Sequence, residues 1–282
     1  MEYIIIILVL LATSKVTLQG VFARKYISDT ANSICFNGII YFFASFIFAY
    51  ALKCSPPVIA FSLLFGLLTV IFQLCYIQAM RCGNISLTVL IVNSGMMIPI
   101  LVSALFFDEQ FGILKLSGIL AIHISLFLNT QKNMIRLNLK WLLFALSAFL
   151  ANGCLAVCQQ IFGKSVWCDE RVSFVAWSYL LATIISFIMY FIFSSKQKRS
   201  EFKINRFALT YGLLTGVILG IFQILNTKAI ATIDAGLLFP VYNRGTLVLT
   251  TIMGVFLFKD KLTRKQIASI IVGIIGIILI NL

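Results

Sequence analysis

This sequence has little charge and hardly any of the side chains that enzymes use for acid–base or metal chemistry. Asp, Glu, Lys and Arg make up 11% of its 282 residues, and the only histidine is His123. A water-soluble domain of this length needs many more charged residues on its surface, so the composition excludes one. A single histidine and nine scattered acidic residues also provide no cluster for general acid–base catalysis or for a catalytic metal ion.

The short motifs of cofactor and nucleotide sites are missing as well. The seven cysteines form no CxxC pair, which predicts neither a metal site nor a disulfide framework. The sequence has no Walker motif and no dinucleotide-binding fingerprint. We therefore expect no cofactor, no metal, no catalytic residues and no direct use of ATP, and we predict that the chain is not an enzyme.

Long hydrophobic runs fill the chain instead. Hydrophobic residues account for 61% of it, and its mean hydropathy is +1.05. A run of roughly 20 apolar residues crosses the ~30 Å hydrocarbon core of a bilayer, and it must be helical because lipid offers backbone groups no hydrogen-bond partners. The sequence therefore predicts an all-α integral membrane protein with ten transmembrane helices. The predicted spans are 3–22, 32–52, 58–80, 85–107, 112–130, 139–162, 172–194, 206–228, 235–258 and 266–282.

The first hydrophobic run is interpreted as a permanent span and not as a signal peptide. Glu2 precedes it, Arg24 and Lys25 follow it, and no small-residue cleavage site is apparent. A signal peptide would carry its basic residues before the apolar run.

The basic residues predict which loops face the cytoplasm. Of the 22 lysines and arginines, 15 lie in loops after odd-numbered spans and 5 in loops after even-numbered spans. Because short loops rich in Lys and Arg stay in the cytoplasm, both termini are expected on the opposite side. The net charge of +13 belongs to these loops and does not indicate a nucleic-acid partner. We expect a multi-pass protein of the cell (plasma) membrane with its basic loops cytoplasmic.

The chain repeats itself at a spacing of about half its length. The clearest matches pair 65–69 with 211–215, 72–74 with 222–224, and 92–95 with 242–245. Each repeat holds five predicted spans, an odd number, so the second repeat must enter the membrane from the opposite face. Inverted repeats of this kind are the architecture of secondary transporters. The predicted organisation is a first five-helix repeat at 1–130, a central loop at 131–138 and a second repeat at 139–282.

These features together resemble a known family. The ten spans in two five-helix repeats, the acidic Glu109 and Asp260 after spans four and nine, and Gly273 and Gly276 in the last span resemble the drug/metabolite transporter superfamily, and within it the EamA-type family. The resemblance implies alternating access around a central cavity lined by spans one, three, four, six, eight and nine, with spans five and ten peripheral. It also implies a small-molecule substrate, since members export amino acids and other metabolites or move nucleotide sugars, phosphorylated sugars or choline.

Two cations lie deep within predicted spans, away from their edges, and no acidic residue does. Lys15 is in the middle of span one, and Arg244 is about nine residues into span nine. Ionisable residues at such depth are costly, so each is a candidate functional residue. We expect both to face the cavity and to hold an anionic group of the substrate. The alternative for Arg244 is that it caps backbone carbonyls of a neighbouring helix.

Polar and aromatic residues at corresponding positions of the two repeats complete the candidate site. The remaining candidates for substrate binding are the pairs Gln19 and Gln159, Gln73 and Gln223, and Asn93 and Asn243, together with Tyr76, Trp177 and Tyr242. The alternative is that the amides hydrogen-bond between helices and that the rings serve in packing or in an interfacial belt. His123, on a span expected to be peripheral, is predicted to be structural.

The sequence thus predicts a secondary transporter that exports small polar metabolites such as amino acids or other carboxylates. A buried cation without a buried carboxylate favours an anionic or zwitterionic substrate and disfavours a cationic drug. Two alternatives remain: an exchanger of phosphorylated or sugar-linked metabolites, and, from a different class, a membrane-embedded lipid-processing enzyme. The expected partners are the substrate and the lipid bilayer, and the expected state is a monomer or a weak homodimer.

Overall fold

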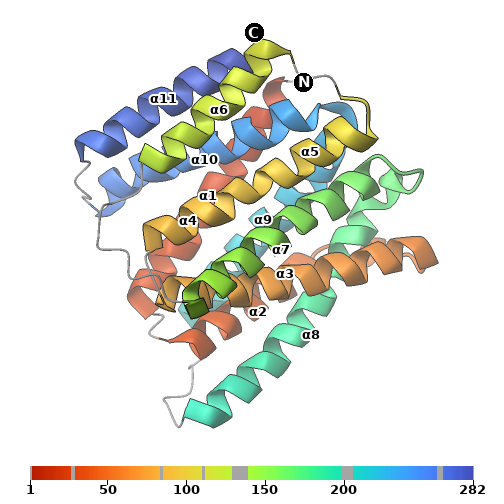
Figure 1. Ribbon diagram of the computed structural model, residues 1–282. Helices are drawn as coiled ribbons and strands as arrows, with labels where there is room; N and C mark the ends of the chain where they lie inside the picture. The colour runs from red at the N-terminus through yellow and green to blue at the C-terminus, as the bar shows by residue number, and fades with distance from the viewer. Residues whose placement is uncertain are drawn as a thin grey trace.

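Long apolar helices account for all the regular secondary structure in the described part of the chain (Figure 1). This computed structural model describes residues 2–26, 29–82, 85–109, 112–128, 139–197, 206–258 and 263–281. The α-helices are α1 (Glu2–Tyr26), α2 (Thr30–Phe46), α3 (Pro56–Cys82), α4 (Ile85–Asn93), α5 (Met97–Phe106), α6 (Ile113–Leu128), α7 (Leu139–Gly163), α8 (Arg171–Gln197), α9 (Arg206–Thr232), α10 (Ala235–Phe258) and α11 (Arg264–Asn281). Short 3₁₀ turns are η1 (Ala49–Ala51), η2 (Ser94–Met96) and η3 (Cys168–Glu170). The predicted central loop 131–138 lies outside the described residues, as does Asp260.

The helices correspond in order to the ten predicted spans. The turn η2 joins α4 to α5 in one continuous segment, so the described residues form ten helical rods. Six of these rods are long and apolar enough to cross a membrane: Tyr3–Phe22, Pro56–Cys82, Leu87–Phe106, Leu139–Gly163, Cys168–Ser194 and Arg206–Thr232. The protein is therefore an all-helical multi-pass protein, and the count of ten spans stays a prediction.

The 3₁₀ turn inside span four has a local cause. Pro99 has no backbone N–H with which to continue the α-helical ladder. The Ser94 hydroxyl donates to the Leu90 carbonyl at 2.9 Å and competes for the same turn. Gly95 sits where a Cβ would lie 2.8 Å from the Phe149 carbonyl oxygen of α7. The turn thus lets the backbones of span four and α7 come close.

The packing of the helices is repeated in the two halves of the chain. In the first half, α3 packs against α7 and α8, and in the second half the corresponding helix α9 packs against α1 and α2. Two corresponding pairs also pack against each other, α2 with α8 and α6 with α11. Figure 1 shows α6 and α11 side by side at one edge of the bundle and α8 at the opposite edge. This pairing fits two inverted five-helix repeats, with spans five and ten peripheral as the resemblance implies.

Glycines bring the backbones together where the two repeats meet. A Cβ on Gly118 of α6 would lie 2.7 Å from the Gly276 carbonyl oxygen of α11, and a Cβ on Gly276 would lie 2.9 Å from the Gly118 carbonyl oxygen. On α9, Gly216 is placed so that a Cβ would lie 2.5 Å from the Ile40 carbonyl oxygen of α2. Helices in lipid gain no hydrophobic energy by associating, so such close contact is a main source of their stability.

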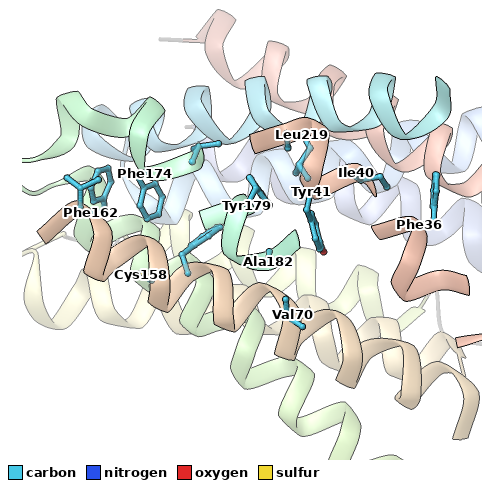
Figure 2. Close-up of a cluster of buried hydrophobic side chains, with 14 of the residues drawn as sticks. Phe36, Ile40, Tyr41, Val70, Cys158, Phe162, Phe174, Tyr179, Ala182 and Leu219 are labelled. Carbon is cyan, nitrogen blue, oxygen red and sulfur yellow. The ribbon is translucent and has the colours of Figure 1, made fainter. Parts of the chain in front are cut away.

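An aromatic core links the repeats beside these contacts. Tyr41 of α2 and Tyr179 of α8 stack with ring centroids 5.5 Å apart, and Phe162 of α7 stacks on Phe174 of α8 at 4.2 Å. Figure 2 shows the two tyrosines near the middle of this buried cluster, with the two phenylalanines at one end and Phe36 at the other. The cluster fixes the positions of the tyrosines relative to both halves of the chain.

A substitution pair tests the backbone contact between α2 and α9. Gly216→Ala places a methyl group against a backbone carbonyl, which must push the helices apart and should cost about 1–3 kcal/mol. Gly20→Ala is the matched control, because no atom lies within 4 Å of its added Cβ, and alanine's higher helix propensity gains up to ~1 kcal/mol. Thermal unfolding of the detergent-purified variants should show a lower Tm only for Gly216→Ala. Equal Tm values for the two variants would contradict this packing.

Candidate functional site

A cavity of about 190 Å³ lies between the two halves of the bundle. Side chains of α1, α2, α3, α7, α8, α9 and α10 form its wall. The lining residues are Lys15, Tyr41, Phe65, Thr69, Phe72, Gln73, Asn152, Leu155, Ala156, Gln159, Tyr179, Leu219, Phe222, Gln223, Asn226, Phe239 and Tyr242. Five of the six spans that the resemblance assigns to the cavity are present. Span four is not among them, and α2 and α8 each contribute a tyrosine.

A hydrogen-bonded network centred on Gln159 forms one side of this cavity. The Gln159 side-chain amide donates to Thr227 Oγ1 at 2.8 Å and to Gln223 Oε1 at 3.1 Å, and its oxygen accepts from Asn226 Nδ2 at 3.0 Å. Gln223 in turn donates to the Tyr179 hydroxyl at 2.9 Å. The network ties α7, α8 and α9 together and presents polar atoms to the cavity.

Lys15 brings a positive charge to the same wall. Its side chain is half-buried, and within the described part of the chain it has no hydrogen bond or ion pair. Gln73 of α3 is likewise half-buried on the wall and without a hydrogen-bond partner among those residues. The described residues of the lining include neither Asp nor Glu. An ammonium and a free amide in these surroundings can hold a carboxylate or a phosphate.

Five of the eleven predicted site residues therefore line the cavity: Lys15, Gln73, Gln159, Gln223 and Tyr242. The other six lie outside its lining, and most have partners of their own. Gln19 donates to Asn37 Oδ1 at 2.8 Å and so joins α1 to α2. Trp177 Nε1 donates to the Lys53 carbonyl at 3.0 Å, in the segment after α2.

The remaining residues outside the lining are held by local contacts. Asn243 donates to the Phe239 carbonyl of its own helix at 2.9 Å. The Tyr76 ring stacks on Phe72, with centroids 5.7 Å apart. Asn93 is half-buried at the end of α4, where span four does not reach the cavity.

The expectation that Arg244 faces the central cavity is wrong. Arg244 is 2% exposed, and its Nη2 donates to the carbonyl oxygen of Ser269 at 2.5 Å and to the Ser269 hydroxyl at 2.8 Å. Ser269 belongs to α11, so the guanidinium caps a neighbouring helix, as the alternative predicted. The reason is angular: at about 100° per residue, Arg244 lies some 200° around α10 from Tyr242, which lines the cavity.

The corresponding glutamines of the two repeats have different partners. Gln159 and Gln223 are hydrogen-bonded, whereas Gln19 bonds to Asn37 and Gln73 faces the cavity. The contacts between the helices differ between the two repeats in the same way. In the described residues α7 packs against α9, while α1 and α3 make only sparse contact. The two repeats therefore have different conformations around the cavity.

Ion pairs join the halves at the end of the bundle where α7 and α9 meet. The Glu109 carboxylate, 8% exposed, lies 2.8 Å from Lys164 Nζ and accepts from the Ala235 N–H at 2.9 Å. This carboxylate follows α5 and caps the start of α10, where the helix dipole favours a negative charge. Lys115 of α6 pairs with Asp234 at 2.8 Å on the same side.

Five polar lining residues were not predicted from the sequence: Tyr41, Thr69, Asn152, Tyr179 and Asn226. Spacing could have found three of them, because Thr69 lies four residues before Gln73 on the same helix face. Asn226 lies three residues after Gln223, and Asn152 lies seven before Gln159, so each shares a helix face with its glutamine. Tyr41 lies on span two and Tyr179 on span seven. The resemblance assigns neither span to the cavity, and no sequence signal marks the two tyrosines.

Comparisons with known proteins agree on family and fold. The model of the EamA-like transporter family matches residues 3–131 and again 139–282. A solved structure described as "Crystal structure of protein" superimposes with a TM-score of 0.78 at 14% identity, covering 98% of this chain and 94% of the other. The comparison with curated proteins gave no significant match.

The repeats provide a matched test of the Gln159 network. Gln159→Leu removes four hydrogen bonds between α7 and α9, and at roughly 0.6 kcal/mol for each bond in a membrane protein this should cost about 2 kcal/mol. Gln19→Leu removes one such bond and should lower the Tm much less. Thermal unfolding in detergent measures both. A Tm for Gln19→Leu as low as that of Gln159→Leu would mean that the network contributes no more than the single bond.

Proposed function

This chain belongs to the EamA-like transporter family, and we propose that it is a secondary transporter that exports small polar metabolites such as amino acids or other carboxylates. It is a multi-pass membrane transporter by family and by its membrane-long apolar helices. We place it in the plasma membrane with its basic loops in the cytoplasm, on the distribution of Lys and Arg between its loops.

The substrate class is inferred from the ammonium group of Lys15, which lies on the cavity wall without a partner among the described residues. A charge at this depth costs at least ~2.5 kcal/mol to place in a membrane, and it is stabilised when an opposite charge joins it. The described lining residues provide no carboxylate, so a negative group of the substrate is the natural partner. Gln73, also unpaired, can accept from the ammonium of an amino acid or donate to its carboxylate.

The size of the cavity favours a small substrate. Its volume of about 190 Å³ is below the ~300–1,000 Å³ that drug-sized ligands occupy. The single ammonium on its wall suits one carboxylate better than a phosphate dianion, which proteins usually hold with several donors. A carboxylate is therefore favoured over a phosphorylated or sugar-linked metabolite, which remains an outcome of the test below.

The difference between the repeats supports alternating access. The second repeat is closed by the bonds of Gln159 with Gln223 and Asn226. In the first repeat no hydrogen bond among the described residues joins Gln19 to Gln73, and Gln19 bonds to Asn37 instead. If the repeats exchanged these conformations, the cavity would close between α1 and α3 and open between α7 and α9. That exchange requires the Glu109–Lys164 ion pair to break, because it joins the halves at the end that must open.

A ligand screen with three variants tests the proposal. Detergent-purified protein is heated with amino acids, dicarboxylates, sugar phosphates and choline, each in turn. A carboxylate present at about 100 times its Kd should stabilise the wild type by ~2.7 kcal/mol. Lys15→Met should abolish the effect and Lys15→Arg should retain part of it. Lys228→Met, which removes an exposed lysine away from the cavity, should behave as wild type.

Two outcomes of this screen would overturn the substrate class. Stabilisation by choline alone would show that the cavity selects cations. Stabilisation by carboxylates that is unchanged in Lys15→Met would show that the ammonium does not hold the substrate. Uptake of the stabilising compound into proteoliposomes, saturable and accelerated by the same compound on the opposite side, then distinguishes a carrier from a channel.

A further inference from the structure

Arg244 is a buried charge whose hydrogen bonding is incomplete. Of the three guanidinium nitrogens, only Nη2 is bonded, to the carbonyl and the hydroxyl of Ser269. Nε and Nη1 are buried and have no hydrogen-bond partner in the described part of the chain. Nε lies against Gly273 of α11, where any Cβ would collide with it.

The partners of Arg244 do not neutralise its charge. Ser269 is neutral, and its hydroxyl donates onward to the Ser125 carbonyl of α6 at 2.7 Å. A guanidinium stays protonated even when buried, so the positive charge remains. A buried charge without a counter-charge is strongly destabilising, which makes the unbonded nitrogens unexpected for a purely structural arginine.

A second, small cavity lies beside the guanidinium, between α10 and α11. Its volume is about 10 Å³, which is close to the room that one water-sized species needs. Its polar lining consists of Arg244, Thr251, Gln266 and Ser269, and the rest of its wall is aliphatic. This cavity shares no lining residue with the central one.

The donors around this cavity outnumber its acceptors. Gln266 Oε1 already accepts from the N–H and the hydroxyl of Thr263, at 2.8 and 3.1 Å. The Gln266 amide nitrogen is then a donor with no acceptor among the described residues. The Thr251 hydroxyl donates to the Leu247 carbonyl at 2.7 Å. Among the residues that the structure describes, no carboxylate takes part in the lining. A site with a cation, a free amide N–H and no acidic group attracts an anion.

We propose that this cavity between α10 and α11 binds one small monovalent anion, of the size of chloride, that neutralises Arg244. A lipid phosphate or a metabolite is too large for the available volume. The anion strengthens the contact between the central helix α10 and the peripheral helix α11, since Ser269 and Gly273 already hold the guanidinium there. The site is independent of the substrate proposed for the central cavity.

The experiment is a thermal-unfolding titration of the full-length protein in detergent. Protein purified in sodium gluconate is titrated with sodium chloride, bromide or nitrate at constant ionic strength. The wild type should show a saturable rise in Tm with each anion. Arg244→Met should show no rise, and Gln266→Leu should need an anion concentration about tenfold higher, because one hydrogen bond to the charged ligand is lost.

Lys15→Met is the control that separates the two cavities. It removes the cation of the central cavity, and it should leave the anion-dependent rise in Tm unchanged. A rise that disappears in Lys15→Met and persists in Arg244→Met would overturn the proposal, because the anion would then sit in the central cavity. No saturable rise in the wild type would overturn it as well and would leave a water molecule or an empty space beside Arg244.

A direct measurement does not depend on whether the arginine variant folds. Crystals of the wild type grown with bromide should show an anomalous peak beside Arg244, within the wall that contains Thr251 and Gln266. A bromide peak only beside Lys15, or none in a crystal that diffracts well enough to place side chains, would contradict the site.

Discussion

The hydrocarbon core of a bilayer offers polar groups no water to bond with, and the arrangement of this bundle follows from where each buried polar group finds a partner. Gln159 satisfies its amide across the contact between α7 and α9. Glu109 satisfies its carboxylate at the start of α10. Lys15 finds no partner within the described residues and faces the central cavity, where a substrate can supply one. The intramembrane polar groups thus serve either to join helices or to bind a ligand, according to whether a partner lies within reach.

The same constraint links the packing of the repeats to transport. Glycines such as Gly216 let backbones of the two halves touch, which gives the bundle its stability without using polar groups. The polar contacts that remain can therefore differ between the halves. The second repeat bonds its glutamines across α7 and α9, whereas Gln73 of the first repeat has no hydrogen-bond partner among the described residues. A fold with two corresponding sets of groups, one bonded and one open, has the asymmetry that alternating access requires.

Much of the architecture could be read from the sequence because it depends on local properties. The length of an apolar run sets whether it can span a bilayer, and all ten predicted spans correspond to helical rods. The repeat paired Gln159 with Gln19 and Gln223 with Gln73, and three of these four glutamines line the cavity. It could not tell which pair would be hydrogen-bonded, because a single sequence repeat does not encode which of two conformations each half adopts.

Lys15 and Arg244 show which properties of a residue the sequence determines and which depend on the tertiary structure. The sequence by itself determined that both cations lie within apolar helices and that no acidic residue shares their depth, because depth follows from position along a helix. Only the tertiary structure decided that Lys15 faces the central cavity while Arg244 faces α11, where Ser269 and Gly273 receive it. The physical reason is that position along a helix and orientation around it have different causes. A hydrophobic run fixes how far a residue lies along the helix axis. The face that the residue presents is set by the close packing of that helix against its neighbours, which here depends on contacts between distant parts of the chain.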